Sequence, residues 1–201
     1  MILAHYYHVY ADGEWQRPLA DHLAMLDSAE LPRRMRVGLV GSPERREAAR
    51  ACLGNGLVVA EADEGYEQVT LRAVRAYAQA HEGAVLYAHT KGAAKVGEFN
   101  DRWRRSMEKR VVGGWRENLA ALADVDAVGC HWLTEAKYKP QIRLPIFGGN
   151  FWMARCDYVA TLPEPAGEPG DAETWIGLGN PRVRDLLPGM PSYWADERWL
   201  P

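Results

Sequence analysis

The chain has 201 residues, of which 47% are hydrophobic, and this length suits one sizeable core and a single domain over residues 1–201. Its formal net charge of -3 excludes the strongly basic class of protein that binds nucleic acid through the phosphate backbone, so we expect no nucleic-acid partner. The three cysteines lie far apart without CxxC or Cys/His spacing, which argues against a disulfide scaffold and a structural zinc site.

Short apolar segments recur through the first half of the chain, and each has the length and flanking turn residues of a β-strand. We predict strands over Ile2–Tyr10, Arg36–Val40, Leu57–Ala60 and Ala84–Ala88. Between them apolar residues recur at helical spacing, for example Leu71, Val74 and Ala78. Strands that alternate with amphipathic helices are typical of right-handed βαβ crossovers, so we predict an α/β fold with a mostly parallel sheet flanked by helices.

The second half has a looser pattern. Apolar positions between Trp103 and Leu122 indicate one kinked helix or two joined helices, with the break at Gly113-Gly114. The other elements that we predict are strands at Val125–Gly129 and Ile146–Ala154, a Pro-containing segment through Pro140, a short helix at Ala172–Gly177 and an aromatic tail at Tyr193–Pro201.

The fourth predicted strand ends in a cluster of polar side chains, His89, Thr90 and Lys91, followed by Gly92. Ligands of open α/β sheets bind outside the carboxyl ends of the strands, which makes this cluster a candidate site. It has neither Walker nor GxGxxG spacing. Two interpretations stand about even: Lys91 and His89 balance a diphosphate, or the loop is simply polar, with Thr90 and His89 binding nearby backbone groups.

Two later segments carry further candidates. Asn150 and Trp152, after Gly148-Gly149, offer an amide and an indole that could bind a sugar, although a glycine-bearing strand is the simpler interpretation of this segment alone. Glu173 stands in the first turn of a predicted short helix, where it is either a general base or a helix-dipole partner.

Two charged segments allow both a structural and a functional interpretation. The run Arg102-Trp-Arg-Arg105 is typical of an exposed helix face with Trp103 buried, and its functional alternative is the binding of a diphosphate or other anion. Asp124-Val-Asp126 has the DxD spacing of metal–nucleotide sites, but it precedes its predicted strand. We therefore interpret this pair as solvated residues at the start of a strand.

Several of these motifs, taken in order, resemble a known family. The chain is similar to small bacterial glycosyltransferase-like proteins related to rhamnan-synthesis proteins, which have a nucleotide-sugar fold of GT-A type. The segments that carry the resemblance are His5–Tyr10, Leu86–Gly92, Trp103–Met107, Gly149–Arg155 with Tyr158, and Glu173–Ile176. The resemblance implies a single-domain GT-A-like (Rossmann-like) fold and a hexosyltransferase-like enzyme of polysaccharide biosynthesis.

The resemblance also implies partners and roles. The partners are a nucleotide-diphosphate sugar as donor and a carbohydrate or other hydroxyl compound as acceptor. Glu173 would deprotonate the acceptor, while Lys91 with His89 would stabilise the leaving group. The residues that we assign to substrate binding are Thr90, Gly92, Asn150, Trp152, Arg104 and Trp175.

One departure from the family concerns the cofactor. Many GT-A enzymes carry a metal-binding DxD after the fourth strand, where this chain has His89–Gly92. The resemblance implies a divalent cation, Mn²⁺ or Mg²⁺. However, this chain has no carboxylate ligands at that place, so we assign no metal ligand.

Two alternatives to this enzyme stay open. The first is a non-catalytic nucleotide-sugar or carbohydrate-binding module with a degenerate glycosyltransferase fold. The second is a nucleotide-dependent enzyme of another α/β family, against which the missing glycine fingerprints count. The sequence shows no apolar run of about 20 residues and no secretory leader, so we expect a cytoplasmic protein without a transmembrane segment.

Overall fold

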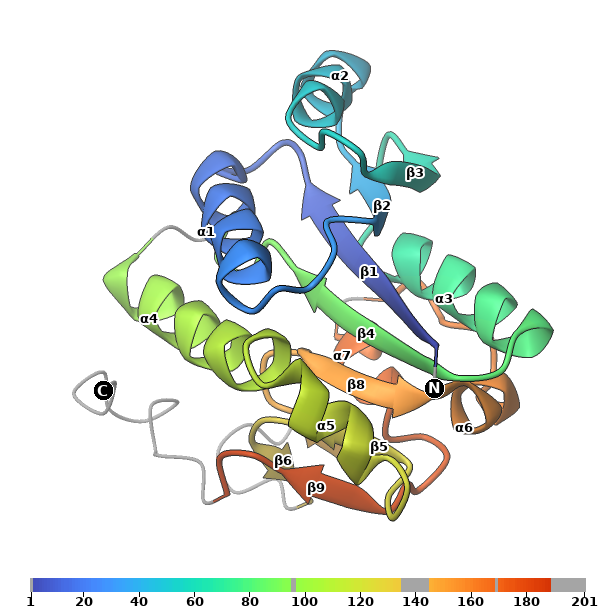
Figure 1. The fold of residues 1–201 in the computed structure, drawn as a ribbon. Helices are drawn as coiled ribbons and strands as arrows, with labels where there is room; N and C mark the ends of the chain where they lie inside the picture. The colour runs from blue at the N-terminus through green and yellow to red at the C-terminus, as the bar shows by residue number, and fades with distance from the viewer. Residues whose placement is uncertain (1, 95–96, 135–144, 169, 189–201) are drawn as a thin grey trace.

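A seven-stranded sheet with helices on both faces forms the centre of the fold (Figure 1). The computed structural model describes residues 2–94, 97–134, 145–168 and 170–188; Pro140 and the predicted tail Tyr193–Pro201 lie outside these residues. The strands lie in the order β3-β2-β1-β4-β8-β5-β9. Their bounds are β1 (Leu3–Tyr10), β2 (Met35–Val40), β3 (Leu57–Ala62), β4 (Ala84–His89), β5 (Ala127–Gly129), β8 (Trp152–Arg155) and β9 (Val183–Asp185).

Strand β8 runs antiparallel to both of its neighbours, β4 and β5, whereas the other neighbouring strands of this sheet are parallel. The predicted mostly parallel α/β sheet is therefore confirmed. Two short strands, β6 (Trp132–Leu133) and β7 (Ile146–Phe147), form a separate antiparallel pair.

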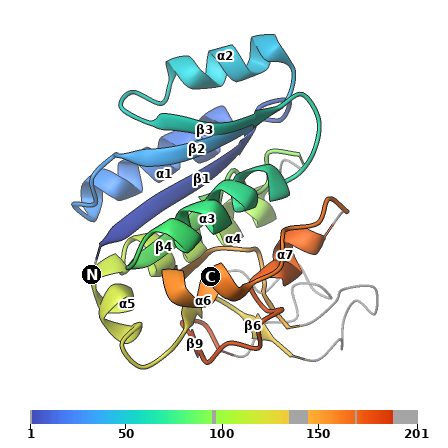
Figure 2. The same cartoon turned by 90° about the vertical axis from the view of Figure 1, so that its right-hand side faces the viewer.

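The helices divide between the two faces of the sheet, as Figures 1 and 2 show from two sides. One face carries α1 (Gln16–Ser28), α2 (Pro43–Ala51), α4 (Glu98–Met107), the π-helix η1 (Glu108–Val112) and α5 (Trp115–Ala121). The other face carries α3 (Gln68–Ala80), α6 (Cys156–Thr161) and α7 (Asp171–Trp175). None of the helices among the described residues combines the length and the apolar character needed to cross a membrane.

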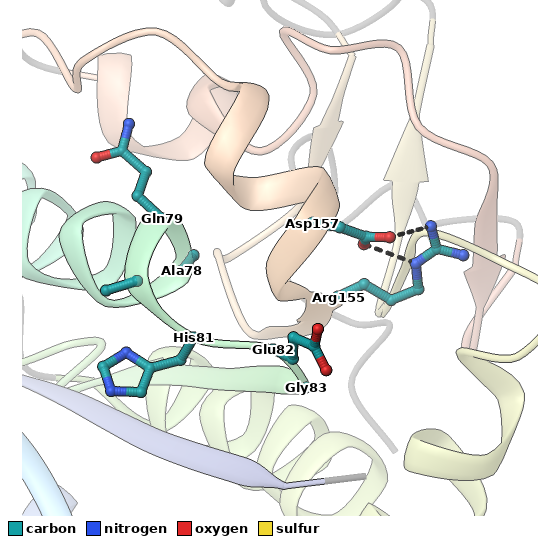
Figure 3. Close-up of a pocket in the computed structure, with 8 residues that line it drawn as sticks. Ala78, Gln79, His81, Glu82, Gly83, Arg155 and Asp157 are labelled. Carbon is teal, nitrogen blue, oxygen red and sulfur yellow. Dashed lines mark hydrogen bonds and ion pairs between the residues drawn. The ribbon is translucent and has the colours of Figure 1, made fainter.

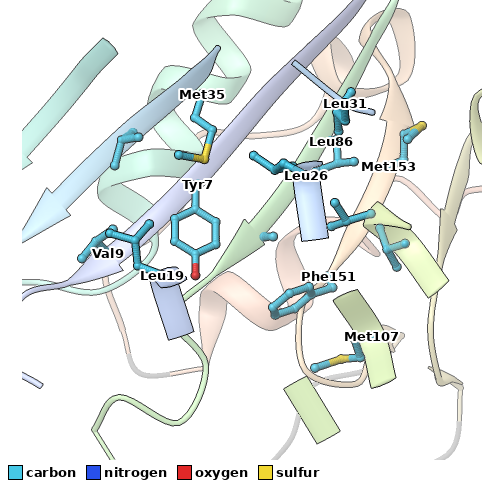
Figure 4. Close-up of a cluster of buried hydrophobic side chains, with 14 of the residues drawn as sticks. Tyr7, Val9, Leu19, Leu26, Leu31, Met35, Leu86, Met107, Phe151 and Met153 are labelled. Carbon is cyan, nitrogen blue, oxygen red and sulfur yellow. The ribbon is translucent and has the colours of Figure 1, made fainter. Parts of the chain in front are cut away.

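The central strands β1 and β4 are buried on both sides, which explains why their sequences are almost continuously apolar. Successive side chains of a strand point to opposite faces. Tyr7 and Leu86 therefore join the cluster beneath α1 and α4 (Figure 4), while Tyr6 and Tyr87 join the cluster beneath α3 and α6. Each face has its own core, and the two cores fix the sheet between the helices.

The second half departs from prediction most clearly at Ile146–Ala154, and β6, α6 and β9 have no predicted counterpart. Ile146–Ala154 was expected to be one strand, but it divides into β7 and β8 around a turn in which Gly149 and Asn150 both have positive φ. Backbone in that conformation cannot continue a strand. By contrast, the expected break at Gly113-Gly114 separates η1 from α5, in agreement with the prediction of joined helices.

Candidate functional site

A cleft of about 730 Å³ opens where β1, β2, β3 and β4 end. Its walls come from the residues that follow β1, from the loop between β3 and α3, from the segment His89–Gly92 and from Glu173 of α7. The carboxyl ends of parallel strands are the usual place for a ligand in an open α/β sheet. The polar cluster at the end of β4 therefore lies in a cleft at the expected edge of the sheet.

Lys91 and Glu173, which are far apart in the sequence, meet on one wall of this cleft. The Lys91 Nζ atom lies 4.0 Å from Glu173 Oε1. It also lies 3.9 Å from the centre of the Trp103 ring, which is a cation–π contact. The ammonium is therefore held between an indole from α4 and a carboxylate from α7.

His89 lies at the floor of the cleft, and its hydrogen bond determines which ring nitrogen carries the proton. The Nε2 atom is 2.9 Å from the Gly149 carbonyl oxygen, which can only accept, so Nε2 donates its proton there. Burial lowers the pKa of His89 to about 3, and the Lys91 charge adds to this effect. With this pKa His89 is neutral at pH 7, so the positive charge that was predicted to balance a diphosphate rests on Lys91.

Glu67, which follows the loop after β3, joins His89 at the floor. Its Oε1 atom lies 3.4 Å from His89 Nδ1. Its Oε2 atom accepts hydrogen bonds from the Tyr87 hydroxyl at 2.8 Å and from Asn150 Nδ2 at 2.6 Å. One carboxylate thus connects the end of β4 with the turn before β8.

A second imidazole lies beside the first, because His8 of β1 is the register partner of His89. Its Nδ1 atom is 2.8 Å from Thr70 Oγ1. Burial lowers the pKa of His8 to about 4, while the nearby Glu67 charge acts in the opposite direction. The floor of the cleft therefore carries two neutral imidazoles at pH 7.

The other two residues of the predicted loop, Thr90 and Gly92, also line the cleft. The Thr90 hydroxyl oxygen accepts a hydrogen bond from the Tyr10 backbone N–H at 3.0 Å. This is the structural role that the sequence left open for Thr90. Gly92 has a φ of +90°, a conformation that L side chains rarely adopt, so a glycine at this position lets the loop turn.

Gly149 is required by close packing as well as by its φ of +88°. A Cβ atom here would lie 2.6 Å from the Met107 sulfur and 3.0 Å from the Trp103 ring. The missing side chain lets the Gly149 carbonyl reach His89 while Trp103 packs against the same turn. Gly149 thereby couples the floor of the cleft to the helix that holds Lys91.

Three predicted sugar-binding residues are buried away from the cleft, which contradicts direct contact with a ligand. Asn150 is 0% exposed, and its Oδ1 atom accepts a hydrogen bond from Trp152 Nε1 at 2.8 Å. The Trp152 ring is stacked on Tyr87, and Trp175 donates its N–H to the Pro163 carbonyl. These indoles belong to the core because their polar atoms find partners inside the protein.

Arg104 is also placed elsewhere, in a buried ion cluster between α1 and α4, and the prediction that it binds substrate is contradicted. Its side chain is 0% exposed. It lies 2.7 Å from Asp21, 3.3 Å from Asp101 and 3.2 Å from Glu108. A guanidinium that is shared by three carboxylates is not available to an anionic ligand.

The lining of the cleft is acidic. Among the described residues that line it, Lys91 is the one lysine or arginine, against five carboxylates: Asp12, Asp63, Glu64, Glu67 and Glu173. Asp12 accepts from the backbone N–H and hydroxyl of Ser42, and Asp63 pairs with Arg46 at 2.5 Å. The segment His89–Gly92 itself contains no carboxylate, but neighbouring elements bring carboxylates to it.

These carboxylates do not form a ready metal site. Within the described part of the chain, no three His, Cys, Asp or Glu side chains lie close enough together to hold an ion. A divalent cation with oxygen ligands needs several convergent acceptors, and three of the five carboxylates, Asp12, Asp63 and Glu67, are already bound to protein donors. The geometry therefore does not fit the cation that the resemblance implies, and no step below depends on one.

A second hollow, of about 550 Å³, lies at the opposite edge of the sheet, between the end of α3 and the start of α6 (Figure 3). Arg155 and Asp157 line it, but their side chains are directed toward one another and bind at 2.6 Å (Figure 3). Their charges are therefore compensated within the protein. The cleft at the carboxyl edge is the better candidate because it retains groups that face a ligand without such a partner.

The sequence interpretation missed several groups of the cleft. His8 stands within the quoted segment His5–Tyr10, but only its place in the register of β1 puts it beside His89. Asp63 and Glu64 belong to an acidic segment after β3, and the position of this segment at a strand end already points to this edge of the sheet. Glu67 lies just before α3, and nothing local distinguishes it from an ordinary residue at a helix start.

Comparison with known structures supports the fold. Residues 1–349 of S. aureus TarS match at a TM-score of 0.50 and 12% identity, over 91% of this chain and 57% of that one. The chain thus spans little more than half of the TarS structure. TarS in complex with UDP-GlcNAc gives a TM-score of 0.45 at 11% identity, over 91% and 55% of the two chains. Rv0371c from Mycobacterium tuberculosis H37Rv gives 0.48 at 16% identity, over 92% and 88%.

At such identities the likeness concerns the fold alone. Together with the observed sheet, the first match confirms the predicted GT-A-like α/β architecture. No curated protein matches the sequence. A family described as "Domain of unknown function (DUF8361)" matches residues 6–167, and the chain belongs to that family.

Proposed function

We propose that the protein is a glycosyltransferase that moves a sugar from a nucleoside-diphosphate sugar to the hydroxyl of a carbohydrate or another acceptor. The observation that carries this proposal is the pairing of Lys91 and Glu173 on one wall of the cleft, at 4.0 Å. Such a pair offers a cation for a departing phosphate and a carboxylate for a hydroxyl proton within one site. The relation to rhamnan-synthesis proteins, a role in polysaccharide biosynthesis and a cytoplasmic location are part of this proposal.

In the proposed step, the acceptor oxygen bonds to the anomeric carbon as the bond between that carbon and the diphosphate breaks. The hydroxyl proton passes to Glu173, whose side chain is 27% exposed and reachable from the cleft. The electron pair of the broken bond leaves with the nucleoside diphosphate, whose negative charge the Lys91 ammonium stabilises. The Trp103 ring holds that ammonium in place before the reaction.

A second function is favoured by the acidic lining. Carboxylates repel a diphosphate but accept hydrogen bonds from sugar hydroxyls, and they outnumber lysine five to one around the cleft. This charge pattern supports a carbohydrate- or nucleotide-sugar-binding module that lacks transfer activity. Both functions require a ligand in the same cleft, so binding alone does not distinguish them. Turnover does, because only the glycosyltransferase has it.

The test combines binding with turnover. Calorimetry with UDP, GDP and their sugars, with and without Mn²⁺, identifies a ligand, and a transfer and hydrolysis assay then measures chemistry. We expect Lys91→Ala to lower turnover about 10²-fold through loss of electrostatic stabilisation, and Glu173→Gln to lower it at least about 10²-fold through loss of the base. Lys109→Ala, on η1 and outside the cleft, is the matched control and should keep full activity.

Each outcome decides between the two functions. Transfer that is undiminished in both cleft variants would contradict the roles of Lys91 and Glu173. Binding without hydrolysis or transfer, with any donor and with or without Mn²⁺, would establish the binding module instead. Dependence of turnover on Mn²⁺ would show that bound substrate phosphates complete a cation site that the protein alone does not form.

A further inference from the structure

A third hollow, of about 730 Å³, carries an excess of cations. It lies where the end of α1 meets η1, α5 and β9. Among the described residues that line it, the cations are Lys109 and Arg110 of η1 and Arg184 of β9, and the carboxylates are Glu117 and Asp185. We call it the basic hollow. Its formal charge is positive, whereas that of the cleft is negative, and the two share no described lining residue.

The cations of the basic hollow stand without a carboxylate partner. None of the three forms an ion pair with another described residue. By contrast, Arg104, Arg105 and Arg116 of the neighbouring helices each bind at least one carboxylate. Like charges that gather in one recess repel each other. An anion placed between them would remove this repulsion and accept charge-assisted hydrogen bonds from them.

The two acidic residues of the hollow do not take the place of that anion. The Asp185 carboxylate accepts hydrogen bonds from the backbone N–H groups of His131 and Trp132, both at 2.8 Å, and of Leu187 at 3.0 Å. It is thereby bound to the segment that follows β5. Glu117 is exposed in the first turn of α5, where a carboxylate interacts favourably with the helix dipole. Both carboxylates therefore have a structural role apart from the cations.

The walls of the hollow are held in place by hydrogen bonds that do not involve its cationic groups. The element η1 is a π-helix, a rare geometry that is frequently found at functional sites. The Asn118 Nδ2 atom donates to the carbonyl oxygens of Arg110 at 2.9 Å and of Val111 at 3.0 Å. The Trp115 indole donates to the Ala29 carbonyl at 3.0 Å and joins α5 to the end of α1. The backbone that presents Arg110 is therefore fixed by the protein itself.

We propose that the basic hollow binds a small organic anion of the phosphate class, which Arg110 and Arg184 hold from two elements. A guanidinium donates two parallel hydrogen bonds to phosphate oxygens, a geometry that arginine offers and lysine does not. Met25 and Leu186 also line the hollow and provide apolar surface for the organic part of the ligand. The proposal goes beyond glycosyl transfer, because this site is separate from the cleft.

A soluble phosphate ester fits the hollow better than the headgroup of a phospholipid. A face that binds a membrane surface places large apolar side chains beside its cations, so that they enter the lipid. The large apolar side chains that are exposed among the described residues all lie outside the hollow: Ile2, Leu57, Tyr66 and Leu178. The hollow is therefore a recess for a small ligand and lacks the apolar surface that a membrane contact needs.

The test measures the binding of sn-glycerol 3-phosphate to the full chain by calorimetry. Lys91→Ala serves as the background, because it removes the lysine of the cleft and leaves the lining of the basic hollow unchanged. We expect Arg110→Gln and Arg184→Gln each to weaken binding roughly tenfold, the value of one hydrogen bond to a charged group. The amide signals of Gly113 and Gly114, which line the hollow, should shift in NMR spectra as the ester is added.

Two further variants separate this site from a general effect of charge. Glu117→Gln removes a negative charge from the hollow and should strengthen binding, by up to about fivefold. Arg45→Gln, at an exposed position of α2, removes the same charge as the two arginine variants of the hollow. It is their matched control and should leave the affinity unchanged.

Several results would overturn the proposal. They are the absence of binding at about 10 mM glycerol 3-phosphate, unchanged affinity in Arg110→Gln and Arg184→Gln, and an equal loss in Arg45→Gln. Binding to vesicles of phosphatidylglycerol without binding of the soluble ester would also overturn it and would assign the hollow to a lipid headgroup. None of these measurements requires glycosyl transfer, so the proposed function can fail while this site is confirmed.

Discussion

Two polar clusters of this protein each place a histidine beside a glutamate, and they differ in access. The cleft cluster opens to the cleft, whereas the buried cluster is enclosed between α1 and α4. The cleft cluster consists of His89, Glu67, Tyr87 and Asn150. The buried cluster consists of Arg104, Glu108, His22 and Asp21. Arg104 is shared by carboxylates on several sides and is 0% exposed, whereas His89 and Glu67 both line the cleft. A histidine beside a glutamate therefore indicates a site only where one side stays accessible.

The largest effect should come from breaking the buried cluster. Arg104→Met keeps an apolar chain of similar length but leaves Glu108, which is 1% exposed, without its cation. Removing one member of a buried ion pair costs about 3–5 kcal/mol, because its partners stay in the protein without the donor that they share. Burial raises the pKa of Glu108 to about 8, so this group can take up a proton, and the loss should lie at the lower end of that range. We expect a loss of that size in the free energy of unfolding, measured by urea denaturation. The cleft should still bind its ligand in the folded fraction.

Arg102→Met is the matched control for this loss. Arg102 belongs to the same helix, but its side chain is 50% exposed and pairs with Glu98 at the surface. Exposed pairs contribute about 0–1 kcal/mol, so this variant should be close to the wild type. Equal losses in the two variants would mean that Arg104 is no more enclosed than its neighbour, and the comparison of the clusters would fail.

An intermediate effect should come from the turn beneath the cleft cluster. Gly149→Ala meets two obstacles, the positive φ and the Cβ contacts with Met107 and Trp103. Gly170→Ala meets only the first, because its φ is +87° and no atom lies within 4 Å of the added Cβ. We expect a loss of about 1–2 kcal/mol in Gly170→Ala from the backbone conformation. Gly149→Ala should lose about 1–3 kcal/mol more through overpacking.

The difference between the two alanine variants isolates the close approach at Gly149. It should be visible in urea denaturation, and the His89 imidazole signals should move in Gly149→Ala alone, because the Gly149 carbonyl is displaced. If both variants lose the same stability, the turn accommodates a methyl group, and Gly149 is required for its φ alone.

Local patterns predicted the elements of the first half, because a buried strand or an amphipathic helix is encoded within about ten residues. The position of His89–Gly92 at a ligand-binding edge followed from that pattern as well. The roles of single side chains did not. Arg104 is buried because Asp21, 83 residues earlier, reaches it. Trp152 is part of the core because β8 is inserted antiparallel beside β4. Such partners come together through packing between distant segments, and the periodicity of residues along the chain does not predict them.

The smallest effect concerns the pH dependence of stability in the buried cluster. Burial, together with the Arg104 charge, lowers the pKa of His22 from its usual 6.5 to about 3. His22 therefore binds a proton in the unfolded chain but not in the folded chain, and stability is lost as the pH falls below 6.5. At pH 5 this one residue should cost about 2 kcal/mol relative to pH 7.5.

The slope of the unfolding free energy against pH tests this expectation independently of the packing that a variant disturbs. His22→Gln should reduce the loss of unfolding free energy between pH 7.5 and pH 5 by about 2 kcal/mol, even if it lowers stability at every pH. His81→Gln, at the exposed end of α3, is the control for the replacement of a histidine by glutamine. An unchanged slope in His22→Gln would mean that the imidazole can take up a proton in the folded state. A buried imidazolium beside Arg104 needs water or a nearby carboxylate to compensate its charge. The buried cluster would then be accessible to such a group, and it would differ less from the cleft cluster than the structure indicates.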